Sequence, residues 1–280
     1  MTRTERHEPT IVEILDDQQL AAYQQALSRE RGLILAVGPT HAGKAALLYH
    51  GMRMLRRLRG QHVPMATVEW VIRGSLEDAT RVVVSREDGI TFDSALKRLA
   101  DQGTKAFLIG EIHDLATADE AVRLTTQRRR LILSTLHTVD APHALERLLN
   151  LGVPAQAVGE SVVLVFALRA FRKLCPACKK PLRLPPPSLR AAGLSESEIS
   201  DSLVLWEPNR EGCGECQGGF QGRHYVCQMM RMTDAIRAAL AEGDVREISR
   251  VATREGMKPL RSELIDAVKA GHVWLPDIEE

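Results

Sequence analysis

The sequence predicts an α/β fold built on a parallel sheet. A short apolar run at residues 32–37 is followed by a glycine-bounded loop and then by a helical segment at 46–53. Further apolar runs of strand length follow, at 64–69, 80–84, 106–111 and 131–135. Helical patterns lie among them, at 93–101 and 140–152. Strands that alternate with helices are typical of a parallel sheet, whose ligands bind at the carboxyl ends of the strands.

The loop after the first apolar run nearly matches the phosphate-binding pattern G-x-x-x-x-G-K-[ST]. Its residues are Gly38, Pro39, Thr40, His41, Ala42, Gly43, Lys44 and Ala45. In such a loop, backbone N–H groups and the positive end of the helix dipole surround an anion, and the lysine reaches the outer phosphates. Ala45 departs from the pattern, because a methyl group cannot ligate Mg²⁺ as a hydroxyl does. We predict that the loop binds phosphate; the alternative is a strand–helix turn that binds no ligand. The loop alone does not decide whether the nucleotide is hydrolysed.

Two polar side chains follow later strands of the predicted sheet. Glu111 ends the apolar run at 106–111, and His137 comes shortly after the run at 131–135. In phosphate-loop enzymes, a carboxylate at such a strand end orients the metal or the attacking water. Because Gly38, Glu111 and His137 all come just past strand ends, we expect them to meet at one site.

Four cysteines form two C-x-x-C pairs, Cys175 with Cys178 and Cys213 with Cys216, separated by residues 179–212. Tetrahedral Zn²⁺ in structural sites is typically held by four such thiolates. We therefore predict a zinc staple with no open catalytic position; the alternative is four reduced structural cysteines. Cys227 is left over, and we expect it to be a small buried hydrophobe.

Composition excludes several classes of protein. The chain has 280 residues, 44% of them hydrophobic, and a formal net charge of +1. A charge so close to zero argues against a nucleic-acid partner. No apolar run reaches the roughly 18 residues that span a bilayer. Residues 1–8 are charged and lack the apolar segment of a signal peptide, so we expect a cytoplasmic protein whose cysteines bind metal before they form disulfides.

The predicted organisation has four parts. Residues 1–31 form a lead-in helix with an apolar stripe that includes Leu15, Tyr23 and Leu27. The core covers 32–172, the four-cysteine module covers 173–228, and a helical subdomain covers 229–280. Helical patterns in that last part lie at 233–241, 245–255 and 260–270.

These motifs resemble the nucleoside-triphosphatase motors of type II secretion and type IV pilus assembly. The resemblance rests on the phosphate loop up to Tyr49, on two boxes and on the cysteine pairs. The first box is G-E-I-R-D, here residues 110–114, and the second is S-T-L-H-T-N-D-A, here residues 134–141. Residues 255–260 also resemble the C-terminal helical region of the family. The match extends over about residues 15–278.

The resemblance implies a RecA-like core, bound ATP with Mg²⁺, and a hexameric ring. It also implies docking to an inner-membrane platform protein, and so a cytoplasmic location peripheral to the inner membrane. Glu111 would orient the attacking water, and His137 would sense the terminal phosphate or couple neighbouring subunits. Only about 30 residues precede the core, so we expect a homo-oligomer, a mixed hexamer with a full-length motor, or a fragment of a longer chain.

The chain departs from the family at several charged positions. The acidic box E-D-P-x-E reads Glu69-Trp70-Val71-Ile72-Arg73, so Glu69 is its remnant. His113 replaces the arginine of G-E-I-R-D, and His41 replaces a loop glycine. Two arginines of a further segment have become Lys97 and Asp101.

Lost arginine contacts to a transferring phosphoryl group are worth factors of about 10³–10⁵ in rate. We therefore expect an ATP-binding subunit with weak hydrolysis, unless Arg81, Arg98 or Arg147 compensates. The alternative is a pseudo-ATPase or accessory subunit that acts through assembly. A nucleic-acid motor is a third and disfavoured hypothesis, which strong salt-dependent DNA binding would revive.

Overall fold

The computed structural model describes residues 9–60, 62–85, 87–200 and 202–278. Two compact units make up the chain. The first comprises the chain up to Leu168 together with Gln228–Met257, and the second comprises Arg169–Cys227 and the chain from Lys258. The division into four parts, at residues 31, 172 and 228, stays a prediction. Within the described ranges, no helix has both the length and the apolar character needed to cross a membrane.

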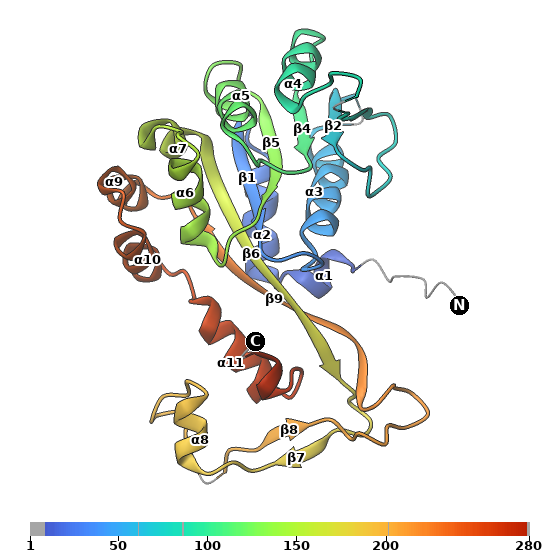
Figure 1. Cartoon of the computed structure of the whole chain (residues 1–280), viewed down its shortest axis with the longest axis vertical. Helices are drawn as coiled ribbons and strands as arrows, with labels where there is room; N and C mark the ends of the chain where they lie inside the picture. Colours follow the sequence, from blue (N-terminus) through green and yellow to red (C-terminus); the bar gives the residue numbers. More distant parts are fainter. Residues whose placement is uncertain (1–8, 61, 86, 201, 279–280) are drawn as a thin grey trace. The chain divides into compact units, whose positions relative to one another are not determined.

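A seven-stranded sheet organises the first unit, with strands in the order β3-β2-β4-β5-β1-β6-β9 (Figure 1). Its strands are β1 Gly32–Val37, β2 Met65–Glu69, β3 Thr80–Val83, β4 Ala106–Ile109, β5 Leu131–Leu136, β6 Val162–Leu174 and β9 Phe220–Arg231. Every pairing from β3 across to β6 is parallel. The predicted α/β fold with a parallel sheet is therefore confirmed. Both β6 and β9 continue from the first unit into the second.

Helices cover both faces of the sheet. They are α1 Ile11–Ile14, α2 Asp17–Leu27, α3 Lys44–Arg59, α4 Phe92–Asp101, α5 Leu115–Thr126, α6 Ala141–Asn150, α7 Ala155–Ser161, α9 Asp234–Glu242 and α10 Val245–Arg254. Side chains alternate along β1, and Leu33, Leu35 and Val37 join one core cluster with residues of α4–α7, α9 and α10. The opposite face receives α3, where an added Cβ at Gly51 would overlap the Tyr23 hydroxyl and lie 2.9 Å from Leu133. Glycine at position 51 therefore lets α3 lie close to α2 and the sheet.

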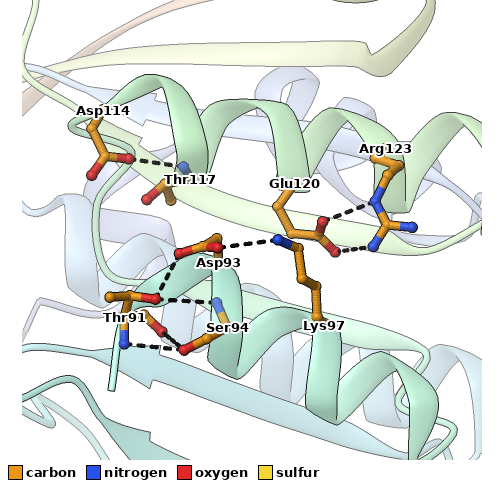
Figure 2. A network of polar contacts seen from close by, with 8 residues as sticks. All are labelled: Thr91, Asp93, Ser94, Lys97, Asp114, Thr117, Glu120 and Arg123. Atoms are coloured by element: carbon orange, nitrogen blue, oxygen red, sulfur yellow. Dashed lines mark hydrogen bonds and ion pairs between the residues drawn. The ribbon is translucent and has the colours of Figure 1, made fainter. Parts of the chain in front are cut away.

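The two helices that flank β4 have fixed starting points (Figure 2). The side chain of Thr91 accepts a bond from Ser94 N at 3.3 Å and caps α4, while Asp114 accepts from Thr117 N at 2.8 Å and caps α5. A capping side chain satisfies an N–H group that has no partner within the helix. Because α5 starts directly after Asp114, the cap also fixes the short loop that carries Glu111.

The segment predicted as a single lead-in helix contains two helices, α1 and α2. Leu15 is extended at the end of α1, and Asp16 then caps α2 by accepting a bond from Gln19 N at 2.7 Å. The apolar residues of the predicted stripe continue across the break between α1 and α2, and so the pattern gave no sign that Asp16 caps a second helix. Residues 1–8 of the predicted segment lie outside the described residues.

The second unit packs a small core around its helices. Its further elements are β7 Lys180–Leu182, α8 Pro186–Ala191, β8 Leu205–Glu207, α11 Leu260–Lys269 and the 3₁₀-helix η1 Leu275–Ile278. Strands β7 and β8 are antiparallel. Leu189, Leu205, Val226, Val268 and Val273 are among the buried residues of this core.

Candidate functional site

The phosphate-loop segment connects β1 to α3 with its lysine turned inward. Lys44 is 7% exposed, and its Nζ donates to the carbonyl oxygens of Gly38 and Pro39, each at 2.7 Å. Gly43 caps α3 with a φ of 95°, which is the left-handed conformation that glycine adopts at little cost. The loop thus folds around the Lys44 ammonium group, which its own carbonyl oxygens hold in place.

The remaining loop residues differ in their exposure. Pro39, Thr40 and His41 are exposed, whereas Ala42 is buried and Ala45 is half-buried. His41 has a φ of 64°, which is uncommon for a residue other than glycine. Ala45 is the second residue of α3, so its methyl group stands at the position where the phosphate-binding pattern has a hydroxyl.

Neighbouring strand ends bring Glu111 and His137 together. Strand β5 lies between β4 and β1, and Val37 is paired with Leu136, so Gly38 and His137 follow paired residues. The Oγ1 of Thr135 donates to Gly110 O at 2.6 Å, and Ile112 N donates to Thr135 O at 3.0 Å, which holds the loop after β4 against β5. Nε2 of His137 and Oε2 of Glu111 lie 3.7 Å apart. The predicted meeting of these two residues therefore has a geometric basis, and both side chains remain partly open to solvent.

Glu69, the acidic-box remnant, is buried and bonded to Tyr49. The Tyr49 hydroxyl donates to Oε1 of Glu69 at 2.5 Å. Burial raises the pKa of the Glu69 carboxyl, against the lowering effect of the Tyr49 bond and of Arg73 and Arg81. Burial and the neighbouring carboxylate together raise the pKa of Tyr49 to about 12. The pair links α3, the helix that follows the phosphate loop, to the carboxyl end of β2.

An aromatic cluster occupies two of the substituted positions. The Trp70 ring lies 5.3 Å from Phe92 and 5.8 Å from His113, and the rings of Phe92 and His113 lie 5.5 Å apart. Nε2 of His113 lies 3.2 Å from Oδ2 of Asp114. Trp70 and His113, which the resemblance marks as departures from an aspartate and an arginine, therefore make ring-to-ring contacts.

Two further substituted positions, Lys97 and Asp101, form ion pairs with nearby side chains. Lys97 forms an ion pair at 3.1 Å with Asp93 on its own helix, as Figure 2 shows. Asp101 forms an ion pair at 2.5 Å with Arg128 in the loop before β5.

The four predicted metal ligands converge within the second unit. The Sγ atoms of Cys175, Cys178, Cys213 and Cys216 all lie within 4.8 Å of one another, which is close enough to hold a metal ion. Burial disfavours the Cys216 thiolate, but N–H groups of Cys213 and Gly219 and the neighbouring thiols lower the pKa of Cys216 to about 7, whereas burial and the neighbouring thiols raise the pKa of Cys178 to about 12. Thiolate donors in a group of four suit Zn²⁺. Cys227 is buried apart from this group, as expected.

Sequence reasoning missed the Tyr49–Glu69 bond and the aromatic cluster. Tyr49 belongs to the family pattern, but a tyrosine on a helix gives no signal of a carboxylate partner 20 residues later. Trp70 and His113 were recognised as substitutions only. The two residues follow β2 and β4, and the pairing of these strands brings the rings together, but the sequence does not show which strands pair.

Comparisons with known proteins agree with these motifs. The family described as type II/IV secretion system protein matches residues 12–280. The type IV pilus assembly ATPase PilB of Pseudomonas aeruginosa is 36% identical over 248 residues, covering 88% of this chain and 43% of that protein. The type II secretion system ATPase E of Vibrio cholerae is 28% identical over 257 residues, covering 91% and 49% respectively. The chain thus spans about half the length of these curated relatives, or less.

A solved structure of similar fold is the pilus retraction motor PilT with bound ADP. Its TM-score is 0.67 at 20% identity, and the match covers 97% of this chain and 66% of that chain. The ATPase DotB of Legionella pneumophila has the same TM-score at 13% identity, covering 98% and 65%. At this level of identity the likeness shows the fold alone.

Proposed function

We propose that this chain, which belongs to the type II/IV secretion system protein family, is an ATP-binding subunit of a type II secretion or type IV pilus assembly machine with weakened hydrolysis. The observation that carries the proposal is the closed loop around Lys44, beside the strand ends that bear Glu111 and His137. Because the chain spans only part of its relatives, this assignment concerns the nucleotide-binding region.

The loop and the start of α3 supply the groups that a triphosphate needs. Backbone N–H groups at a helix N-terminus bind phosphate oxygens, and Lys44 would transfer its bonds from Gly38 and Pro39 to the outer phosphates. Glu111 would orient the attacking water, and His137 would sense the terminal phosphate. The eight loop residues from Gly38 to Ala45 would thus bind the phosphates, and Glu111 and His137 would take part in hydrolysis.

The residues present fit Mg²⁺ only weakly. Ala45 offers no oxygen, and Glu69 is engaged with Tyr49. Mg²⁺ usually retains several water ligands, so a water can occupy the place of the missing hydroxyl. When bound, the ion would neutralise developing phosphate charge, and we expect it to be held loosely.

A pseudo-ATPase or accessory subunit is the second candidate, and the local pairing of Lys97 and Asp101 favours it. Neither residue supplies an uncompensated positive charge, since one is paired with Asp93 and the other is itself an acid paired with Arg128. Such a subunit would act through assembly with partner subunits.

The remaining parts of the proposal come from the family. The four-cysteine cluster would hold a structural Zn²⁺ through Cys175, Cys178, Cys213 and Cys216. The chain would join a hexamer, either of its own copies or mixed with a full-length motor, without nucleic acid. It would act in the cytoplasm, docked on an inner-membrane platform protein.

Steady-state ATP turnover tests the proposal, with ATP affinity measured by calorimetry on the same samples. Ala45→Thr should raise turnover because it restores a metal ligand, and Glu111→Gln should abolish the residual turnover without abolishing binding. Glu242→Gln, on the exposed surface of α9, removes a carboxylate elsewhere as a control. Normal motor rates in the wild-type protein would contradict weakened hydrolysis. An absence of ATP binding would leave only the assembly role.

A further inference from the structure

Basic residues stand in a row at the amino ends of three neighbouring strands. Arg31, Arg130 and Lys105 immediately precede β1, β5 and β4, which are adjacent and in step. Gly32 N donates to Arg130 O at 3.1 Å, and Leu131 N donates to Lys105 O at 3.2 Å. Because neighbouring strands lie about 4.8 Å apart, the three cations leave the sheet side by side.

Further cations gather around this row. Oε2 of Glu30 lies 2.6 Å from Nη2 of Arg129, and Arg129, with Arg59 and Lys105 nearby, lowers the pKa of the Glu30 carboxyl. Arg31 also donates to Thr126 O, at the C-terminal end of α5. We define the amino-edge patch as Glu30, Arg31, Arg59, Asp101, Lys105, Arg128, Arg129 and Arg130.

Charge is strongly segregated in this patch. Its six cations face two carboxylates, an excess of four positive charges, whereas the whole chain carries only +1. Arg31, Lys105 and Arg129 are exposed. Such a concentration of one sign attracts an oppositely charged partner and speeds its association.

Two arginines of the patch have donors without acceptors. Nε and Nη2 of Arg59 and Nε of Arg130 are shielded from solvent, and they have no hydrogen-bond partner among the described residues. A buried donor left unsatisfied destabilises a protein, more so when the group is charged. These two guanidinium groups therefore keep part of their donor capacity unmatched by acceptors among the described residues.

We propose that the amino-edge patch docks an acidic polypeptide segment of a partner protein, at the sheet edge opposite the phosphate loop. Five of the six cations are arginine, whose planar fork matches carboxylate geometry. The patch already binds two carboxylates, each through one guanidinium nitrogen, in the Arg129–Glu30 and Arg128–Asp101 pairs. The proposal is independent of nucleotide binding, which uses the other edge.

Fluorescence anisotropy with a labelled poly-glutamate peptide and the full chain tests the proposal. The peptide should bind in low salt and dissociate as salt rises, and a poly-glutamine peptide should not bind. The triple variant Arg59→Gln/Arg129→Gln/Arg130→Gln should weaken binding by about tenfold or more. The matched control is Arg246→Gln/Arg250→Gln/Arg254→Gln, which removes equal charge from the exposed surface of α10 and should bind nearly as the wild type does.

Two single variants keep the test decisive if the triple variant fails to fold. Lys105→Glu reverses an exposed charge and should weaken binding, whereas Glu30→Gln removes a competing carboxylate and should strengthen it. ATP affinity should be unchanged in both. Equal losses in the triple variant and its control would overturn the proposal, as would an absence of peptide binding. Tighter patch-dependent binding of duplex DNA, or of anionic lipid vesicles, would overturn it in favour of those partners.

Discussion

Tyr49 donates a hydrogen bond of 2.5 Å to the buried carboxyl group of Glu69, and so joins the helix behind the phosphate loop to the carboxyl end of β2. The bond satisfies a group whose burial would otherwise be costly. It also occupies the only acidic side chain that remains at the acidic-box positions, residues 69–73.

Tyr49→Phe should lower the free energy of unfolding by about 1–3 kcal/mol, because Glu69 would lose its donor inside the protein. Chemical denaturation measures this change. Tyr23→Phe is the matched control, since it removes a buried hydroxyl that donates to Leu47 O at 3.1 Å, a carbonyl within α3. The control should cost less, and equal costs for the two variants would argue against a special role of the carboxyl group.

Gly51→Ala should destabilise the first unit by about 1–3 kcal/mol or more, because the new methyl group overlaps the Tyr23 hydroxyl. Gly159→Ala places a methyl group in another helix, 3.4 Å from Arg237, which is an ordinary contact. That control should stabilise α7 by up to about 1 kcal/mol through helix propensity. Thermal unfolding of both variants compares them, and a tolerated alanine at position 51 would mean that α3 does not pack as described.

Stability should fall as the pH drops from 6.5 toward 4, in part through His224. Its ring stacks on His272 with centroids 4.7 Å apart. Burial, together with His272 and Lys173, lowers the pKa of His224 from 6.5 to about 4. The unfolded chain therefore takes up this proton before the folded chain does, and the contribution of His224 is complete only above pH 6.5.

His224→Phe tests this pH dependence, because it keeps a stacking ring and removes the titration. Denaturation midpoints between pH 7 and about 4 should then vary less than in the wild type. His62→Phe, which replaces an exposed histidine outside this ring pair, is the control for the substitution itself. If stability varies with pH in His224→Phe as it does in the wild type, His224 does not contribute to the pH dependence.

Metal analysis should find one zinc ion per chain, lost in Cys178→Ser because three thiolates hold Zn²⁺ less well than four. Cys227→Ala removes a cysteine outside the cluster and should keep its zinc. A strong chelator should lower the stability of the wild type and of Cys227→Ala, and leave Cys178→Ser nearly unaffected. Zinc-free wild-type protein would leave four reduced cysteines as the alternative.

Much of the first unit could be predicted because its signals are local. The bounds of β1 equal the predicted run, because Arg31 precedes the six residues and Gly38 of the phosphate loop follows them. Asp140 caps α6, as its position in the sequence indicated. β9 was missed, because Gln221 and Arg223 interrupt any apolar alternation near its start. The partners of Glu69 and Trp70 could not be predicted, because the first contact depends on how α3 packs against β2 and the second on which strands lie next to each other.

Lys44 keeps its ammonium group inside the loop by bonding to Gly38 and Pro39. Arrival of a polyphosphate would then exchange carbonyl oxygens for phosphate oxygens around a charge that is shielded from solvent throughout. The heat-capacity change of association would accordingly reflect the surface of the incoming nucleotide, with little contribution from ordering of the polypeptide.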